Sequence, residues 1–215
     1  MKKLLVFGIA FIWTLQSFSQ IWVIGGKRIE GNGIQTTREV TLPYEFKALK
    51  VIGNLDVTTT KNSVNRIIIV GDENLIEHIK IKHTDDGLLK IINPVKHQLI
   101  PSNGKKIKIT IPYSMLKSIS LSGTGKLRLT ETINVNQLEI TLRGSGSARV
   151  PINVSNVNAK ISGSGTIRLL GKAETSCLKV RGTGAIQAQE LETKNKEISV
   201  SGSGKITFAD SMYPY

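Results

Sequence analysis

Apolar and polar residues alternate along most of the chain between residues 46 and 208. The alternation is most regular in five segments, each with two apolar residues at spacing two, a Gly-x-Gly step, and two more apolar residues at spacing two. The steps lie at Gly123 and Gly125, Gly144 and Gly146, Gly163 and Gly165, Gly182 and Gly184, and Gly202 and Gly204. A spacing of two is the period of a β-strand. Each segment therefore predicts a strand, a glycine-containing corner and a second strand.

The five segments form an internal repeat, because their first glycines are 21, 19, 19 and 20 residues apart. A fixed period with matching inward positions favours a solenoid, in which parallel coils stack and bury a shared aliphatic core. Glycine suits the corners because it reaches positive φ and allows backbones to approach closely. A meander of antiparallel hairpins is the alternative. We predict an all-β, single-domain, β-helix-like solenoid over residues 119–215, with a five-coil core about 19 Å from first to last coil.

The preceding part of the chain, residues 46–118, has a less regular strand pattern and is predicted to cap one end of the solenoid. Gly53 and Asn54 interrupt alternating apolar residues like a degenerate step of the repeat. Residues 79–92 indicate a hairpin, and Asp72 is expected to cap a short helix. Residues 94–104 are expected to form a loop, and the polar residues 20–45 a leader ordered only near residues 38–42.

The first 19 residues have the pattern of a cleaved secretory signal peptide. Lys2 and Lys3 precede an apolar run over residues 4–15, and small residues follow. A membrane anchor is the alternative, but the run is shorter than the roughly 20 residues that a spanning helix needs. The mature protein is expected to have no transmembrane segment and to lie in the periplasm, on the outer surface or outside the cell. At the other end, residues 212–215 are expected to fold over the last coil.

The net charge is strongly positive, at +13 for the whole chain, and falls to +11 without Lys2 and Lys3. Such a balance fits a solvated basic surface, or a partner that is a nucleic acid, an anionic glycan or an acidic cell surface. Aromatic residues are nearly absent from the repeats, with Phe208 the exception. This argues against single-stranded nucleic acid, which needs stacking platforms, and we expect no nucleic acid partner.

Motifs for chemistry are sparse. Cys177 is the single cysteine, so an intramolecular disulfide is excluded, and no histidine is near it in sequence. The positions after the second glycines lack the Asp of calcium-binding β-rolls; they hold Lys126, Ser147, Thr166, Ala185 and Lys205. Acidic residues fall between the repeats, where solvated loops are expected. We therefore predict no catalytic residues, metal or cofactor.

One pattern does indicate binding, because basic residues recur beside the glycine steps. On a parallel solenoid they would form stripes that face solvent and could hold an anionic polysaccharide through guanidinium contacts. The alternative is that they only keep the sheet surface soluble. The candidate residues are Lys126, Arg128, Arg143, Arg149, Arg168, Arg181 and Lys205.

Several motifs over residues 31–208 resemble one known family. They are the steps Leu-Ser-Gly-Thr-Gly, Ile-Ser-Gly-Ser-Gly and Val-Ser-Gly-Ser-Gly, the Gly31-Asn32-Gly33 motif followed by Arg38 and Phe46, and the stretch from Gly71 to Leu75. Together they resemble the auto-transporter adhesin head GIN domain family of exported Gram-negative bacterial proteins. Arg143 and Arg181 replace the usual Ser in two steps. The resemblance implies a β-helix-like domain at the cell envelope with an adhesive role, and it supplies no catalytic residues.

The expected function is therefore non-catalytic binding or adhesion at the cell envelope, toward an unknown surface partner or an anionic polysaccharide. One alternative is a lyase-like, glycan-active enzyme. Another is an envelope scaffold whose solenoids stack end to end into oligomers.

Overall fold

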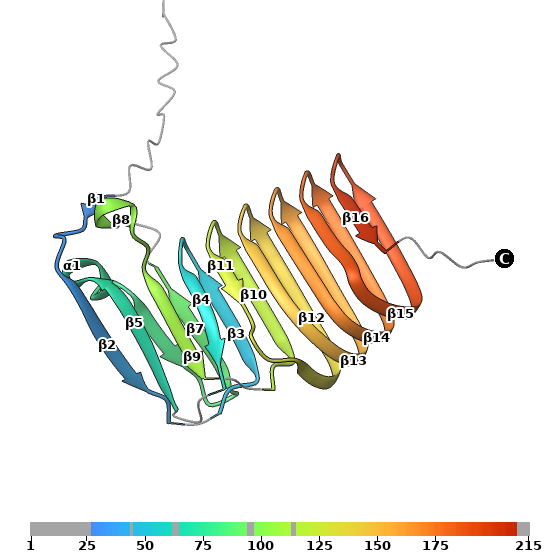
Figure 1. The fold of residues 1–215 in the computed structure, drawn as a ribbon, viewed down its shortest axis with the longest axis horizontal. Helices are drawn as coiled ribbons and strands as arrows, with labels where there is room; N and C mark the ends of the chain where they lie inside the picture. Colours follow the sequence, from blue (N-terminus) through green and yellow to red (C-terminus); the bar gives the residue numbers. More distant parts are fainter. Residues whose placement is uncertain (1–26, 44, 62–64, 94–96, 113–114, 210–215) are drawn as a thin grey trace, which may run out of the picture.

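The computed structural model describes residues 27–43, 45–61, 65–93, 97–112 and 115–209, and Figure 1 shows their arrangement. Strands dominate it, with one short helix, α1 (Glu73–Ile76), and one turn of 3-10 helix over Ser102–Gly104. The strands of the first half are β1 (Lys27–Glu30), β2 (Gln35–Thr41), β3 (Ala48–Ile52), β4 (Asp56–Thr60), β5 (Arg66–Asp72), β6 (Lys80–His83), β7 (Leu88–Ile92), β8 (His97–Ile100) and β9 (Lys108–Pro112). Those of the second half are β10 (Ser118–Gly123), β11 (Lys126–Arg128), β12 (Ile133–Gly144), β13 (Ser147–Gly163), β14 (Thr166–Gly182), β15 (Ala185–Ser201) and β16 (Lys205–Phe208).

The repeats stack in parallel, one coil on the next, as Figure 1 shows. β12, β13, β14 and β15 pair in that order, and equivalent residues of successive repeats lie side by side, so that Gly144 pairs with Gly163 and Gly163 with Gly182. This register confirms the predicted solenoid. The meander alternative is wrong, because every pairing between neighbouring repeats is parallel.

The glycine steps are corners joined by backbone hydrogen bonds. The first glycine of each step has positive φ, for example +125° at Gly163 and +110° at Gly182. The amide N–H of each second glycine donates to the first glycine of the preceding coil, as from Gly165 to the carbonyl oxygen of Gly144 at 2.9 Å. Corner backbone groups that would otherwise be unpaired therefore find partners in the adjacent coil.

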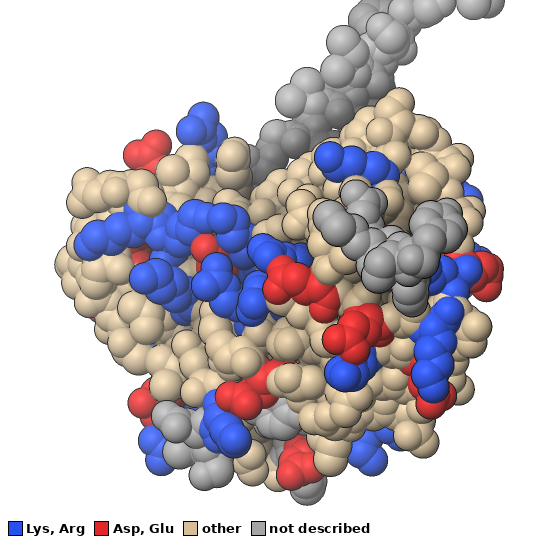
Figure 2. Space-filling model, turned by 45° about the vertical axis from the view of Figure 1, so that its right-hand side comes forward, with Lys and Arg blue, Asp and Glu red and all other residues tan. Residues whose placement is uncertain are grey.

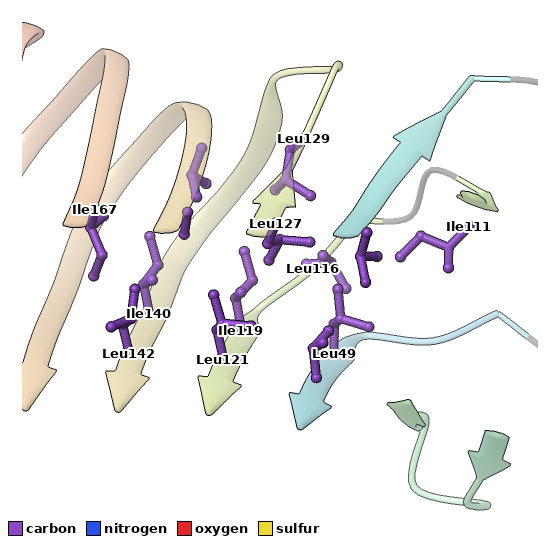
Figure 3. Packing of buried hydrophobic residues seen from close by; sticks show 14 of the residues in the cluster. Leu49, Ile111, Leu116, Ile119, Leu121, Leu127, Leu129, Ile140, Leu142 and Ile167 are labelled. Carbon is purple, nitrogen blue, oxygen red and sulfur yellow. The ribbon is translucent and has the colours of Figure 1, made fainter. Parts of the chain in front are cut away.

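The core lies between two walls of the solenoid. Strand segments before the corners form one wall, the pre-corner wall, and segments after the corners form the other, the post-corner wall. In Figure 3, Ile119 and Leu121 of the first wall point toward Leu127 and Leu129 of the second, and all four are buried. The same alternation places Ile140, Leu142 and Ile167 inside. Polar residues between them consequently face solvent along both walls.

The parallel ladder also continues into the first half of the chain. β3 pairs with β10, and β4 pairs with β11. Gly53, which follows β3 in the segment that leads to β4, has a positive φ of +111°, as the first glycines of the repeats do. Gly53 and Asn54 are thus a further step of the ladder, as expected. One strand farther out, β7 pairs in parallel with β3 and β9 with β4. Beyond these the direction changes, because β6, β5 and β2 pair antiparallel with their neighbours.

Two expectations for the first half are wrong in extent. Order in the leader is not confined to residues 38–42, because β1 pairs with β8 and β2 spans Gln35–Thr41 against β5. The predicted loop over residues 94–104 contains β8 and a turn of 3-10 helix. The expected hairpin is confirmed as β6 and β7.

The role expected for Asp72 is also different. Helix α1 begins after it, but the Asp72 side chain makes no capping hydrogen bond to the helix. Its buried carboxylate instead accepts hydrogen bonds from Gly33, Gln35 and Ser102, which belong to two distant segments. Asp72 therefore joins segments of the chain rather than capping the helix.

The last coil leaves apolar side chains exposed within the described part of the chain. Ile198 and Val200 continue the rows of buried residues from earlier coils, yet they are 51% and 43% exposed. No further described strand covers them, because β16 pairs only with β15. The predicted signal peptide over residues 1–19 and the predicted fold of residues 212–215 over the last coil lie outside the described residues.

Candidate basic binding face

The seven basic residues singled out from the sequence are all exposed, but they are divided between the two walls. Arg143 and Arg181 lie on the pre-corner wall, and the other five lie on the post-corner wall. The predicted stripes therefore form two separate surfaces.

On the pre-corner wall, Arg143 and Arg181 belong to one row across the strands. The row occupies the position just before each corner, and it alternates arginine with serine. In order it contains Ser122, Arg143, Ser162, Arg181 and Ser201. We call it the arginine–serine row. Arg143 and Arg181 are two strands apart, and adjacent strands are separated by about 4.8 Å.

Two lysines that the sequence analysis missed complete this surface. Lys160 and Lys179 pair with each other across β13 and β14 and lie two residues before the arginine–serine row. A shallow groove of about 490 Å³ runs over β12, β13, β14 and β15, and Arg143, Lys160, Lys179 and Arg181 all line it. A search for basic residues three positions before each first glycine would have found both lysines, because Lys160 precedes Gly163 and Lys179 precedes Gly182 by that distance.

Two carboxylates border the basic side chains of the groove. The Lys160 ammonium is 3.8 Å from Glu139, and the Lys179 ammonium is 3.3 Å from Glu197. The hydrogen bond with Glu197 raises the pKa of Lys179 above its ordinary value. Within the described part of the chain, Arg143 and Arg181 form no ion pair with a carboxylate. Their guanidinium groups are therefore available to an anion.

The post-corner wall carries a second basic row. Arg128, Arg149 and Arg168 pair in register on three consecutive coils, as their spacing in the sequence implies. Arg168 is engaged by Glu190 in an ion pair. Lys126 and Lys205 share another row, but Ser147, Thr166 and Ala185 separate them. The structure therefore brings three of the five residues on this wall together.

We expected the acidic residues between the repeats to lie in loops, and this holds for Glu131, between β11 and β12, but not for most of the others. Glu139, Glu174 and Glu190 are on strands β12, β14 and β15, because the strands continue through the segments between corners. Several of these carboxylates form ion pairs with basic residues of the adjacent coil. Their role in the described structure is thus to offset positive charge between neighbouring strands.

The surface as a whole is not evenly charged. Figure 2 shows Lys and Arg side chains gathered in a band on the visible face, with a few Asp and Glu side chains beside it. Rows of guanidinium, ammonium and hydroxyl groups can bind a polyanion through charge-assisted hydrogen bonds.

In the described segments, no three His, Cys, Asp or Glu side chains are grouped to hold a metal ion. The same segments contain no helix long and apolar enough to cross a membrane.

Solved structures with a similar fold come from Bacteroides and Parabacteroides species. A putative adhesin from Bacteroides fragilis is 22% identical with a TM-score of 0.69, over 83% of this chain and 98% of that one. A putative adhesin from Parabacteroides merdae is 21% identical with a TM-score of 0.65, over 84% and 83%. A putative lipid binding protein from Parabacteroides distasonis is 22% identical with a TM-score of 0.64, over 84% and 98%. Identities this low establish the shared fold alone.

No curated protein matches the sequence. A family match does cover most of it, since the sequence pattern described as "Putative auto-transporter adhesin, head GIN domain" extends over residues 45–212. The chain therefore belongs to this adhesin family.

Proposed function

We propose that the protein is an exported protein of the cell surface that binds an anionic polysaccharide without chemical conversion. The family to which the chain belongs is described as putative adhesins, which supports surface binding. The pattern of residues 1–19 supports export through a cleaved signal peptide. Sequencing the amino terminus of the protein recovered from its native host tests the cleavage; an intact Met1 in the mature protein contradicts it.

One observation carries the choice of ligand class. The groove on the pre-corner wall collects four basic side chains from three strands, and hydroxyl groups from Thr141, Ser162, Ser199 and Ser201 line the same groove. Hydroxyls and cations together suit a ligand with both sugar hydroxyls and anionic groups. The groove is a shallow surface on a rigid sheet, which fits an extended polymer better than an enclosed small molecule.

The test compares matched arginine pairs on the two walls. Arg143→Ser with Arg181→Ser removes the two guanidinium groups beside the groove, and serine already occupies the neighbouring positions of that row. The control is Arg128→Ser with Arg149→Ser, which removes the same charge from the other wall. Heparin serves as the probe. We expect the groove pair to weaken binding by about tenfold or more, in line with the loss of two charge-assisted contacts, and the control pair to weaken it much less. Equal effects of both pairs would show that only net charge matters.

A structural role is the second candidate, because the last coil exposes Ile198 and Val200. Two copies could cover these side chains by meeting at their last coils. Continued head-to-tail stacking is disfavoured, since antiparallel strands β2 and β6 form the sheet edges at the other end. Light scattering over a range of protein concentrations tests this role: a concentration-dependent dimer supports it, and a monomer at all concentrations contradicts it.

A further inference from the structure

The basic surface of the pre-corner wall does not stop at the repeats. The residues that pair with Lys160 and Lys179 form a single row across eight strands, from β15 to β6. From the last coil toward the first half of the chain, the row contains Ser199, Lys179, Lys160, Thr141, Ser120, Lys50, Lys90 and Lys82. We call it the lysine row. It has no acidic member.

The row is continuous because the first half of the chain keeps the register of the repeats. Lys50 pairs with Ser120 and with Lys90, and Lys90 pairs with Lys82 across the hairpin of β6 and β7. Residues paired directly across neighbouring strands project from the same side of the sheet. Lys50, Lys82 and Lys90 therefore share the outer face of the pre-corner wall with the groove, and all three side chains are at least partly exposed.

The arrangement of these three lysines is unfavourable for the folded protein alone. Like charges on directly opposed strand positions destabilise a sheet. At the groove end of the row, Glu139 and Glu197 lie close to Lys160 and Lys179. Among the described residues, Lys50, Lys82 and Lys90 form no ion pair. Asp86 attracts Lys90 electrostatically without forming an ion pair with it, so the repulsion is only partly offset. A bound polyanion would relieve this repulsion, which gives the row a functional explanation.

We infer that the lysine row is an extended binding track, along which a linear anionic polysaccharide lies across the strands from the groove to β6. This inference rests on the proposed function and specifies its ligand as a long chain rather than a short motif. Eight strands spaced about 4.8 Å apart give the track a length of about 34 Å. The groove binds one part of the chain, and Lys50, Lys90 and Lys82 bind the part that extends beyond it.

The experiment measures binding of two heparin fractions by the full chain. A tetrasaccharide is short enough to remain in the groove, and a long fraction reaches across all eight strands. The variant combines Lys50→Ser, Lys82→Ser and Lys90→Ser. The control combines Lys105→Ser, Lys108→Ser and Lys194→Ser, which removes three exposed lysines outside both rows of this wall. Circular dichroism verifies that each protein is folded.

We expect the track variant to bind the long fraction at least tenfold more weakly and the tetrasaccharide as well as the wild type does. The salt dependence of long-chain binding should also weaken by roughly one unit of slope per lysine removed. An equal loss of long-fraction binding in the control variant, or an equal loss for both fractions in the track variant, would overturn the inference without contradicting the proposal that the groove is a binding site. If the wild type binds neither fraction, the proposed function fails and the track fails with it.

Discussion

Gly163 lies so close to Gly144 of the preceding coil that a Cβ atom on Gly163 would be 2.6 Å from the Gly144 carbonyl oxygen. Gly163 also has a φ of +125°. Two independent constraints therefore require glycine here, one from conformation and one from space.

Replacement of the corner glycine tests both constraints. We expect Gly163→Ala to lower the free energy of unfolding by about 3 kcal/mol, from backbone strain and displacement of the adjacent coil. Gly33→Ala is the matched control, because Gly33 has a φ of +82° but a Cβ atom there would meet no atom of the described residues within 4 Å. In Gly33→Ala, backbone strain alone should lower the free energy of unfolding by about 1 kcal/mol. Urea denaturation measures both, and equal losses would show that close approach contributes nothing.

The second glycine of the step isolates the effect of space. Gly165 has no positive φ, yet a Cβ there would lie 2.6 Å from the Gly146 carbonyl oxygen and would clash with the Leu142 side chain. We expect Gly165→Ala to destabilise the protein by about 2 kcal/mol through overpacking. A denaturation midpoint like that of the wild type would mean that the coils separate without cost at this corner.

Asp72 gives a prediction about pH. Burial opposes ionisation of its carboxyl group, but hydrogen bonds from Ser102, Gly33 and Gln35 outweigh burial and lower its pKa. In the unfolded chain, the Asp72 carboxyl group takes up a proton at about pH 4, because its pKa there is the ordinary one for Asp. The stabilisation is therefore fully present above about pH 4 and is lost as the pH falls toward the lower pKa of the folded state.

The measurement is stability against pH for wild type and Asp72→Asn. At pH 7 we expect the variant to be about 2–3 kcal/mol less stable, because an amide cannot accept the same set of hydrogen bonds. The difference should shrink as the pH falls below 4. Ser102→Ala should show a smaller loss of about 1 kcal/mol at pH 7. A difference that stays constant down to pH 2 would contradict a role for the ionised carboxylate.

The repeated part of the fold could be predicted from the sequence because its rules are local. Positive φ and close backbone approach both require glycine, so the corners are visible as a pattern of one residue type. A period near 20 residues then fixes the register, and with it the alignment of Arg128, Arg149 and Arg168. The parallel register of the strands confirmed the predicted solenoid, and the family match confirmed the predicted family.

Long-range relationships were not visible in the same way. β1 pairs with β8, although the two strands are far apart in sequence and neither has a repeat partner. Asp72 was expected to act on the adjacent helix, but its contact with Ser102 spans 30 residues. Lys160 and Lys179 were missed because equivalent positions in other coils hold Thr141 and Ser199, so the basic row is interrupted in the sequence.

Alanine substitutions at two equivalent positions of the core test whether the last coil is open to solvent. Ile140 and Ile198 occupy equivalent positions, but Ile140 is buried whereas Ile198 is 51% exposed. We expect Ile140→Ala to cost about 3–4 kcal/mol, as cavity formation in a core does. Ile198→Ala should cost less than about 1 kcal/mol. A large loss for Ile198→Ala at low protein concentration would mean that another part of the chain covers this side chain in solution.

Repulsion within the lysine row predicts that binding and stability oppose each other at Lys50. Lys50 lies directly between Ser120 and Lys90, so Lys50→Ser removes one like-charge pair and extends the hydroxyl stretch of the row. We expect the variant to be more stable than the wild type by about 0.5 kcal/mol at low salt. This gain should vanish in 1 M salt, where the Debye length is about 3 Å and the repulsion is screened.

Thermal unfolding at both salt concentrations measures the gain in stability, with Lys105→Ser as a control for loss of an exposed lysine outside the row. A gain that persists at high salt would assign the effect to strand propensity instead, and the row would then carry no electrostatic cost for a ligand to relieve.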